Sequence, residues 1–194
     1  MDAVSALRYE FPALGLTLGF APARERGLLA DILLFWLEMN RARAASESLI
    51  AAARITWWKD AFASGTTGNV PLAERLLEQA RIAPQVLAEL AGDMAGLTLD
   101  GAPDGVVMHR FAPVITGVFG GDADDLAHIL LAFKAAMAGQ ATDLPPQSSP
   151  QSSSLPMPFR MMGWMAKDPH WLNYPDEQPM LALAMIWAKL RGQV

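Results

Sequence analysis

The chain has 194 residues, of which 52% are hydrophobic, and a formal net charge of −5 at pH 7. This length and composition suit one compact domain spanning residues 1–194, with a sizeable core. The acidic balance excludes nucleic acid as a partner, and the absence of cysteine excludes disulfides, thiolate nucleophiles and cysteine-ligated metals.

We expect neither a targeting segment nor a membrane-spanning segment in this chain. Asp2 and Glu10 interrupt the opening, which therefore lacks the pattern of a signal peptide. The longest apolar runs, at 28–37 and 180–188, are about half as long as the ~20 residues that cross a bilayer. We expect a cytoplasmic protein with no transmembrane segment, and we leave peripheral contact with a membrane open.

Apolar residues at helical spacing predict helices along most of the chain. The first stripe, in a helix over about 24–45, consists of Leu29, Ile32, Leu33 and Trp36. The second stripe, which begins after Ser46, consists of Ile50, Ala53, Trp57 and Ala61. Further helices are predicted over about 71–82, 84–99, 106–119, 122–139, 158–167 and 178–191. No window alternates with a period of two, so the pattern predicts an all-α, single-domain bundle of about eight helices.

Prolines and polar residues predict the interruptions between these helices. Pro113 predicts a kink or a break in the helix over 106–119. The sequence LPPQSSPQSSS predicts a flexible or extended Pro/Ser/Gln connector at about 143–155. The methionine-rich segment after it is expected to pack onto the bundle, with an adaptable contact to a partner or a lipid as the alternative.

The most specific pattern is the run Arg54-Ile55-Thr56-Trp57-Trp58-Lys59-Asp60. It resembles a run in the squalene and phytoene synthase family, where an arginine, an aromatic pair, a basic and an acidic residue follow the helix that bears the first aspartate-rich motif. The preceding stretch LFWLEMNRAR at 34–43 is similar to that helix, and the segments at 155–160 and 187–194 are similar to the C-terminal region of shorter members. The chain also resembles the branch of this family that includes a mitochondrial respiratory complex I assembly factor.

This resemblance implies the trans-isoprenyl diphosphate synthase fold, an all-helical bundle around a cavity. Active members join two allylic diphosphates head to head. Two aspartate-rich motifs on facing helices bind the magnesium ions that such a charged leaving group needs. Under this resemblance the ligand would be an isoprenoid or another lipid-like molecule.

The chain departs from the family where the metal should bind. The segment EMNRARAA at 38–45 contains one carboxylate, Glu38, and has Arg41 and Arg43 where aspartates are expected. These arginines would repel a metal ion but can bind a phosphate directly. The other acidic cluster, Asp122 to Asp125, follows a glycine pair and is expected to cap a helix. Hence we expect no metal site and no cofactor, with magnesium needed only if the protein is an enzyme.

Other chemical signals are weaker. The three histidines, His109, His128 and His170, are widely spaced and do not form a metal motif. Adjacent helical residues point about 100° apart, so one tryptophan of the pair should be buried and the other lateral. Arg54, four residues before Trp58, can lie over that ring.

The candidate residues that face a ligand or cavity are therefore Glu38, Arg41, Arg54, Trp57 and Trp58. Three functions remain open at this stage. The preferred one is a non-catalytic relative of the family that binds a lipid-like ligand or a protein partner. The alternatives are an active head-to-head prenyl transferase that uses allylic diphosphates and magnesium, and a helical scaffold unrelated to isoprenoids.

Overall fold

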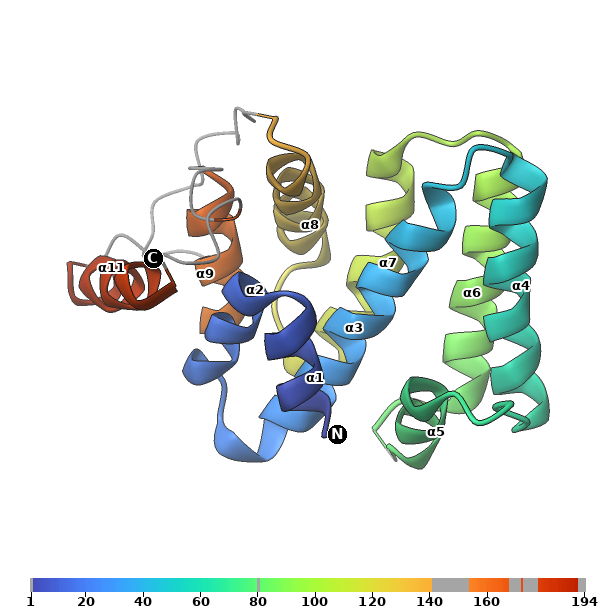
Figure 1. Ribbon diagram of the computed structural model, residues 1–194, viewed down its shortest axis with the longest axis horizontal. Helices are drawn as coiled ribbons and strands as arrows, with labels where there is room; N and C mark the ends of the chain where they lie inside the picture. Colours follow the sequence, from blue (N-terminus) through green and yellow to red (C-terminus); the bar gives the residue numbers. More distant parts are fainter. Residues whose placement is uncertain (1, 80, 141–153, 168–171, 173–177, 192–194) are drawn as a thin grey trace.

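The computed structural model describes residues 2–79, 81–140, 154–167, 172 and 178–191. In this part of the chain we find ten α-helices and no strand, which confirms the all-α prediction (Figure 1). The number exceeds the predicted eight or so because two further helices, α1 (Ala3–Glu10) and α2 (Pro12–Thr17), form before residue 20. Each has no more than eight residues, which is too short for a periodic apolar pattern to identify.

Helix α3 (Arg26–Arg43) crosses the middle of the molecule and forms the centre of the core. Every residue from 28 to 37 is buried. On one side of α3, α4 (Ser48–Ser64) packs along α6 (Pro84–Leu99), and Figure 1 shows this pair standing beside α3. The remaining helices are α5 (Pro71–Glu78), α7 (Asp104–Phe119), α8 (Ala123–Met137), α9 (Met157–Ala166) and α11 (Gln178–Leu190). Two short 3-10 helices, η1 (Leu18–Phe20) and η2 (Ala23–Glu25), lead into α3.

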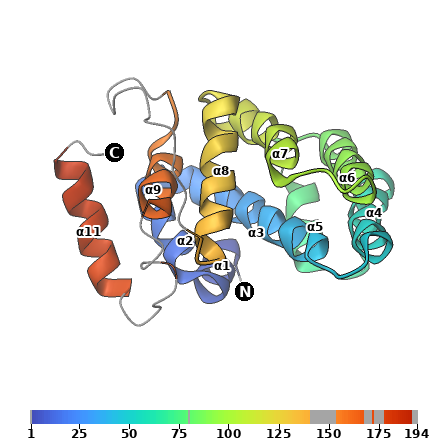
Figure 2. The same cartoon turned by 90° about the horizontal axis from the view of Figure 1, so that it is seen from above.

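The views from the other sides show how these helices surround α3. Helices α7 and α8 pack against each other, and α9 packs on α8 (Figure 2). The methionine-rich α9 is almost wholly buried, so its predicted packing onto the bundle is confirmed. Helix α11 lies at the edge of the molecule in Figure 2 and contacts α2.

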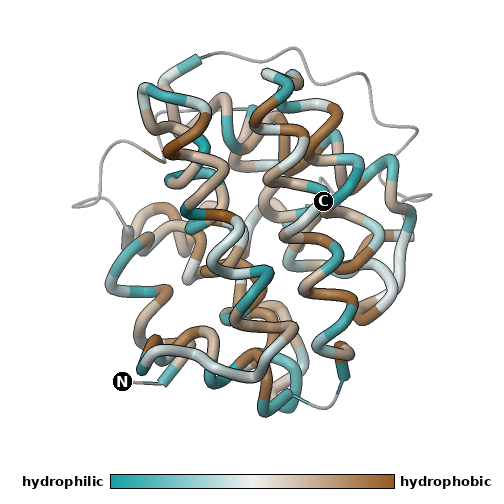
Figure 3. The backbone as a smooth tube through the Cα atoms, turned by 90° about the vertical axis from the view of Figure 1, so that its right-hand side faces the viewer, coloured by the Kyte–Doolittle hydropathy of each residue, from teal (hydrophilic) through white to brown (hydrophobic). Residues whose placement is uncertain are grey.

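The predicted buried stripe of α4 is wrong at three of its four positions. Ile50, Ala53 and Trp57 are exposed, and only Ala61 is buried as predicted. The other buried residues of α4 are Ala51, Ala52, Ile55, Trp58 and Phe62. The error has a physical reason, because α4 carries apolar residues on all sides and its sequence favours no one face. Figure 3, which views the molecule from this side, shows hydrophobic and hydrophilic residues following one another along the helices.

The sequence predicts two interruptions of the helices, one at Pro113 and one at the Pro/Ser/Gln connector. Helix α7 is not broken at Pro113 but continues from Asp104 to Phe119. The hydroxyl of Thr116 donates to the Ala112 carbonyl at 3.2 Å within the same stretch. The connector predicted at 143–155 lies outside the described residues, apart from its last two positions.

Asp122 caps α8, as predicted, and this cap gives a stability test. Its carboxylate accepts a hydrogen bond from the backbone N–H of Asp125 at 3.0 Å. We expect Asp122→Ala to lower the free energy of unfolding by ~1 kcal/mol, because a helix-terminal N–H loses its partner. Urea denaturation measures the change. Asp122→Asn, which retains a capping oxygen, should leave stability nearly unchanged, and an equal loss in both variants would contradict the capping role.

Candidate functional site

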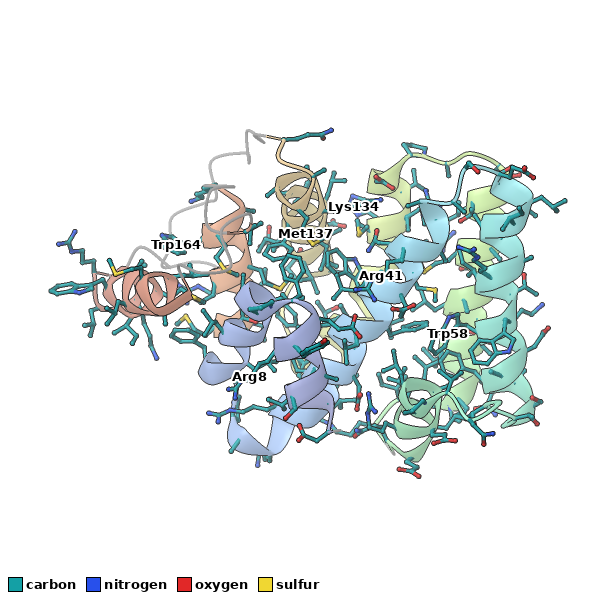
Figure 4. All side chains as sticks on the ribbon, in the orientation of Figure 1. Arg8, Arg41, Trp58, Lys134, Met137 and Trp164 are labelled. Atoms are coloured by element: carbon teal, nitrogen blue, oxygen red, sulfur yellow. The ribbon has the colours of Figure 1, made fainter. Side chains whose placement is uncertain are left out.

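The five candidate residues lie together in the folded chain. A surface hollow of about 330 Å³ between α3 and α4 is lined by Glu38, Arg41, Ala42, Arg54, Trp57 and Trp58. Figure 4 shows Arg41 on the α3 side and Trp58 on the α4 side of this space. The two helices come close because only four residues separate α3 from α4. A short connection makes consecutive helices antiparallel neighbours.

A second hollow, of about 350 Å³, lies beside the first, toward α1 and α5. Two of its lining residues, Glu38 and Trp58, also line the first hollow. Its other lining residues are Ala6, Glu10, Leu34, Val70, Pro71, Leu72 and Arg75. We call the two hollows together the groove. The part toward α5 is mainly apolar, and polar side chains gather at the part toward the end of α3.

The two tryptophans divide as predicted, with Trp58 only 8% exposed and Trp57 38% exposed. Trp58 packs edge-on against Phe35, with ring centroids 5.3 Å apart, and against Trp57 at 5.1 Å. Trp58 therefore belongs to the core on one side and to the groove on the other. Trp57 forms an outer wall of the groove, and its ring carbon Cζ2 lies over Gly68.

Arg41 holds both carboxylates of the groove. Its Nη1 lies 2.7 Å from Glu10 on α1 and 2.6 Å from Glu38 one turn earlier on α3. Burial alone would lower the pKa of Arg41, but the hydrogen bonds to the two glutamates raise it above its ordinary value. A divalent cation at Glu10 and Glu38 would have to displace this arginine. The site thus favours a fixed ion-pair cluster over a metal centre.

Arg54 is the cation of the groove that is free to bind a ligand. It is exposed and, within the described part of the chain, makes no hydrogen bond, ion pair or cation–π contact. The predicted stacking of Arg54 on Trp58 is therefore not observed. A guanidinium at the rim of an apolar groove can donate two hydrogen bonds to a carboxylate or phosphate.

A buried ion pair at the other end of the groove was not predicted from the sequence. Asp31 is 1% exposed, and one carboxylate oxygen accepts a hydrogen bond from Nε of Arg75 at 2.7 Å, while the other accepts from Gln79 at 3.3 Å. Burial raises the pKa of Asp31, and the charge and hydrogen bond of Arg75 oppose this shift. The pair fixes α5 to α3. The available signal was an acidic residue inside the apolar run 28–37.

Arg43, which shares a segment with Arg41, does not reach the groove. Its guanidinium donates to the hydroxyl of Thr98 at 2.8 Å and to the carbonyl of Ala102 at 2.9 Å. It also lies 3.5 Å from Asp104, which forms an ion pair with Lys134 at 2.6 Å. Arg43 thus joins the end of α3 to the turn between α6 and α7, which is a structural role.

His109 and His128, which are 19 positions apart in the sequence, lie side by side in the fold, next to the acidic cluster at 122–125. His109 and His128 lie edge to face with ring centroids 5.6 Å apart, and Nδ1 of His109 is 3.3 Å from Asp124. Among the residues that the structure describes, no group of three histidine, aspartate or glutamate side chains has an arrangement that could hold a metal ion. His170 lies outside those residues.

No family model, curated protein or solved structure matches the chain. No helix in the described ranges has the length and apolarity needed to span a bilayer.

Proposed function

We propose that this protein binds an amphiphilic ligand with a single anionic group, such as an isoprenoid phosphate or another lipid-like molecule, in the groove. We further propose that it is a non-catalytic relative of the squalene and phytoene synthases, working in the cytoplasm. One observation carries the proposal: Glu38, Arg41, Arg54, Trp57 and Trp58 line one hollow, and Glu38 and Trp58 also line a neighbouring, mainly apolar one.

The apolar part of the groove suits the hydrocarbon tail of such a ligand. Leu34, Val70 and Leu72 line it together with the face of Trp58. A volume of about 350 Å³ lies within the range of small-molecule sites, in which apolar walls bury most of the ligand and a few polar groups orient it. The tail would lie toward α5 and the anionic group toward Arg54.

The charges favour one anionic group over a magnesium diphosphate. Arg41 already neutralises part of the charge of Glu10 and Glu38, and Arg75 is engaged by Asp31. This leaves Arg54 to meet the ligand. A diphosphate with its metal ions would need several free carboxylates facing one cavity, whereas the two groove carboxylates are bound to the same arginine.

Titration with farnesyl phosphate, followed by tryptophan fluorescence, tests this assignment. We expect saturable binding, and Arg54→Gln should weaken it about tenfold, equivalent to ~1.4 kcal/mol for a lost charge-assisted hydrogen bond. Farnesol, which lacks the anion, should bind the wild type and Arg54→Gln equally. Arg110→Gln is the matched control, because Arg110 is also exposed but lies on α7 outside the groove.

Thermal unfolding separates this function from the alternatives, since a ligand that binds only the native state raises its stability. Stabilisation by farnesyl diphosphate only when magnesium is present would support the prenyl transferase and overturn our proposal. Failure of farnesyl phosphate, farnesol and farnesyl diphosphate to shift the transition would support the scaffold or a protein partner instead.

A further inference from the structure

Helix α11 carries apolar residues on two faces, and only one of them is covered. Leu181, Met185 and Ala188 are buried on the side that faces the bundle. The opposite side presents large apolar side chains that are each at least 49% exposed: Met180, Leu183, Ile186, Trp187 and Leu190. Figures 1 and 2 show α11 at the edge of the molecule, on the far side of α2 and α9 from the groove.

The exposed residues form a continuous stripe. Positions 180, 183, 187 and 190 follow the three- and four-residue spacing of one helix face, and Ile186 lies beside them. Single exposed apolar residues are ordinary on protein surfaces, but a contiguous stripe of this kind indicates a binding surface.

The charges at the C-terminal end of this helix are positive, whereas Asp176 and Glu177 precede its other end in the sequence. Residues 178–191 contain Lys189 and Arg191 and no carboxylate, although the whole chain has a net charge of −5. The guanidinium of Arg191 lies 5.3 Å from the centre of the Trp187 ring, so a cation accompanies the exposed stripe. The amino group of Lys189 lies 5.6 Å from the Phe20 ring at the same end of the helix.

We propose that α11 docks the protein on a lipid surface that contains anionic phospholipids, with the helix in the plane of the interface. Its leucine, isoleucine and methionine side chains would enter the acyl boundary. Trp187 would lie at headgroup level, and Lys189 and Arg191 would meet the phosphates. Thirteen helical residues extend for ~20 Å, too short to cross a hydrocarbon core of ~30 Å but sufficient to lie on it.

Cosedimentation with phosphatidylcholine vesicles, with and without phosphatidylglycerol, tests this surface. We expect binding to the anionic vesicles that weakens as salt is added. The double variant Leu183→Ser with Trp187→Ser should bind at least tenfold more weakly, and Arg191→Gln should weaken binding to anionic vesicles selectively. Leu49→Ser with Ile50→Ser is the matched control, because these residues are similarly exposed on α4, away from α11, and should not affect binding.

Arg54→Gln should bind vesicles as the wild type does, which separates this surface from the groove. Absence of wild-type binding, or equal binding by the α11 double variant, would overturn the proposal. Analytical ultracentrifugation could also overturn it. If the wild type is a dimer that does not bind vesicles, and the α11 double variant is a monomer, then the exposed stripe packs against a second copy of the chain and not against lipid.

Discussion

Phe35→Ala should lower the free energy of unfolding by about 3–5 kcal/mol, the range for removing a large aromatic side chain from a packed core. Phe35 is almost fully buried on α3, and its ring contacts three others. The centroid distances are 5.3 Å to Trp58, 5.5 Å to Phe62 and 5.8 Å to Phe111. The substitution therefore removes the contact that joins α3 to both α4 and α7. Urea denaturation measures the loss.

Trp57→Ala provides the comparison, because Trp57 is one of the exposed aromatic residues of the same region. We expect this change to lower stability by less than ~1.5 kcal/mol, as its ring gives up little buried surface. Equal losses in the two variants would contradict the outer position of the Trp57 ring.

Arg75→Met should lower the free energy of unfolding by about 3 kcal/mol at pH 7, because it leaves Asp31 buried without its counter-charge. Asp31→Asn should lower stability by much less. It removes the buried charge itself, and the partner that it leaves, Arg75, is partly exposed to water. Thermal and urea unfolding of both single variants and of the double variant measure the coupling between the two residues.

The pH dependence of these variants follows from the same pair. Burial raises the pKa of Asp31 in the folded protein, so folding is favoured when Asp31 is protonated, and this contribution is lost as pH rises through the raised pKa. Removing Arg75 raises that pKa further. Arg75→Met should therefore be less destabilising in mild acid than at pH 7. If the loss of stability in Arg75→Met were the same at both pH values, the unpaired Asp31 carboxylate could not be its cause.

Some of the fold could be predicted because local patterns determined it. The apolar stripe Leu29, Ile32, Leu33 and Trp36 is buried as expected, and α6 has the bounds expected from Pro84 and Leu99. α1 and α2 could not be predicted in this way. They are short, and tertiary packing against α3 and η1 stabilises them more than any periodic pattern does.

The groove was predictable only in part, for a similar reason. Glu38, Arg41, Arg54, Trp57 and Trp58 lie on two helices joined by a short connection, so sequence neighbours became spatial neighbours. Glu10 and Arg75 come from α1 and α5, whose positions depend on packing over long sequence separations. The pairing of Arg41 with Glu10 and that of Asp31 with Arg75 could not be assigned before that packing was known.

Trp58 has a consequence for how this chain can vary. One side of its ring rests on Phe35 and Phe62, and the other side forms a wall shared by both hollows of the groove. A substitution of Trp58 that reshapes the groove also disturbs the core contacts with Phe35 and Phe62. A change in those core residues would in turn shift the Trp58 ring in the groove. For the proposed binding function, we therefore expect substitutions of Trp57 and Arg54 to change ligand preference while the fold is kept.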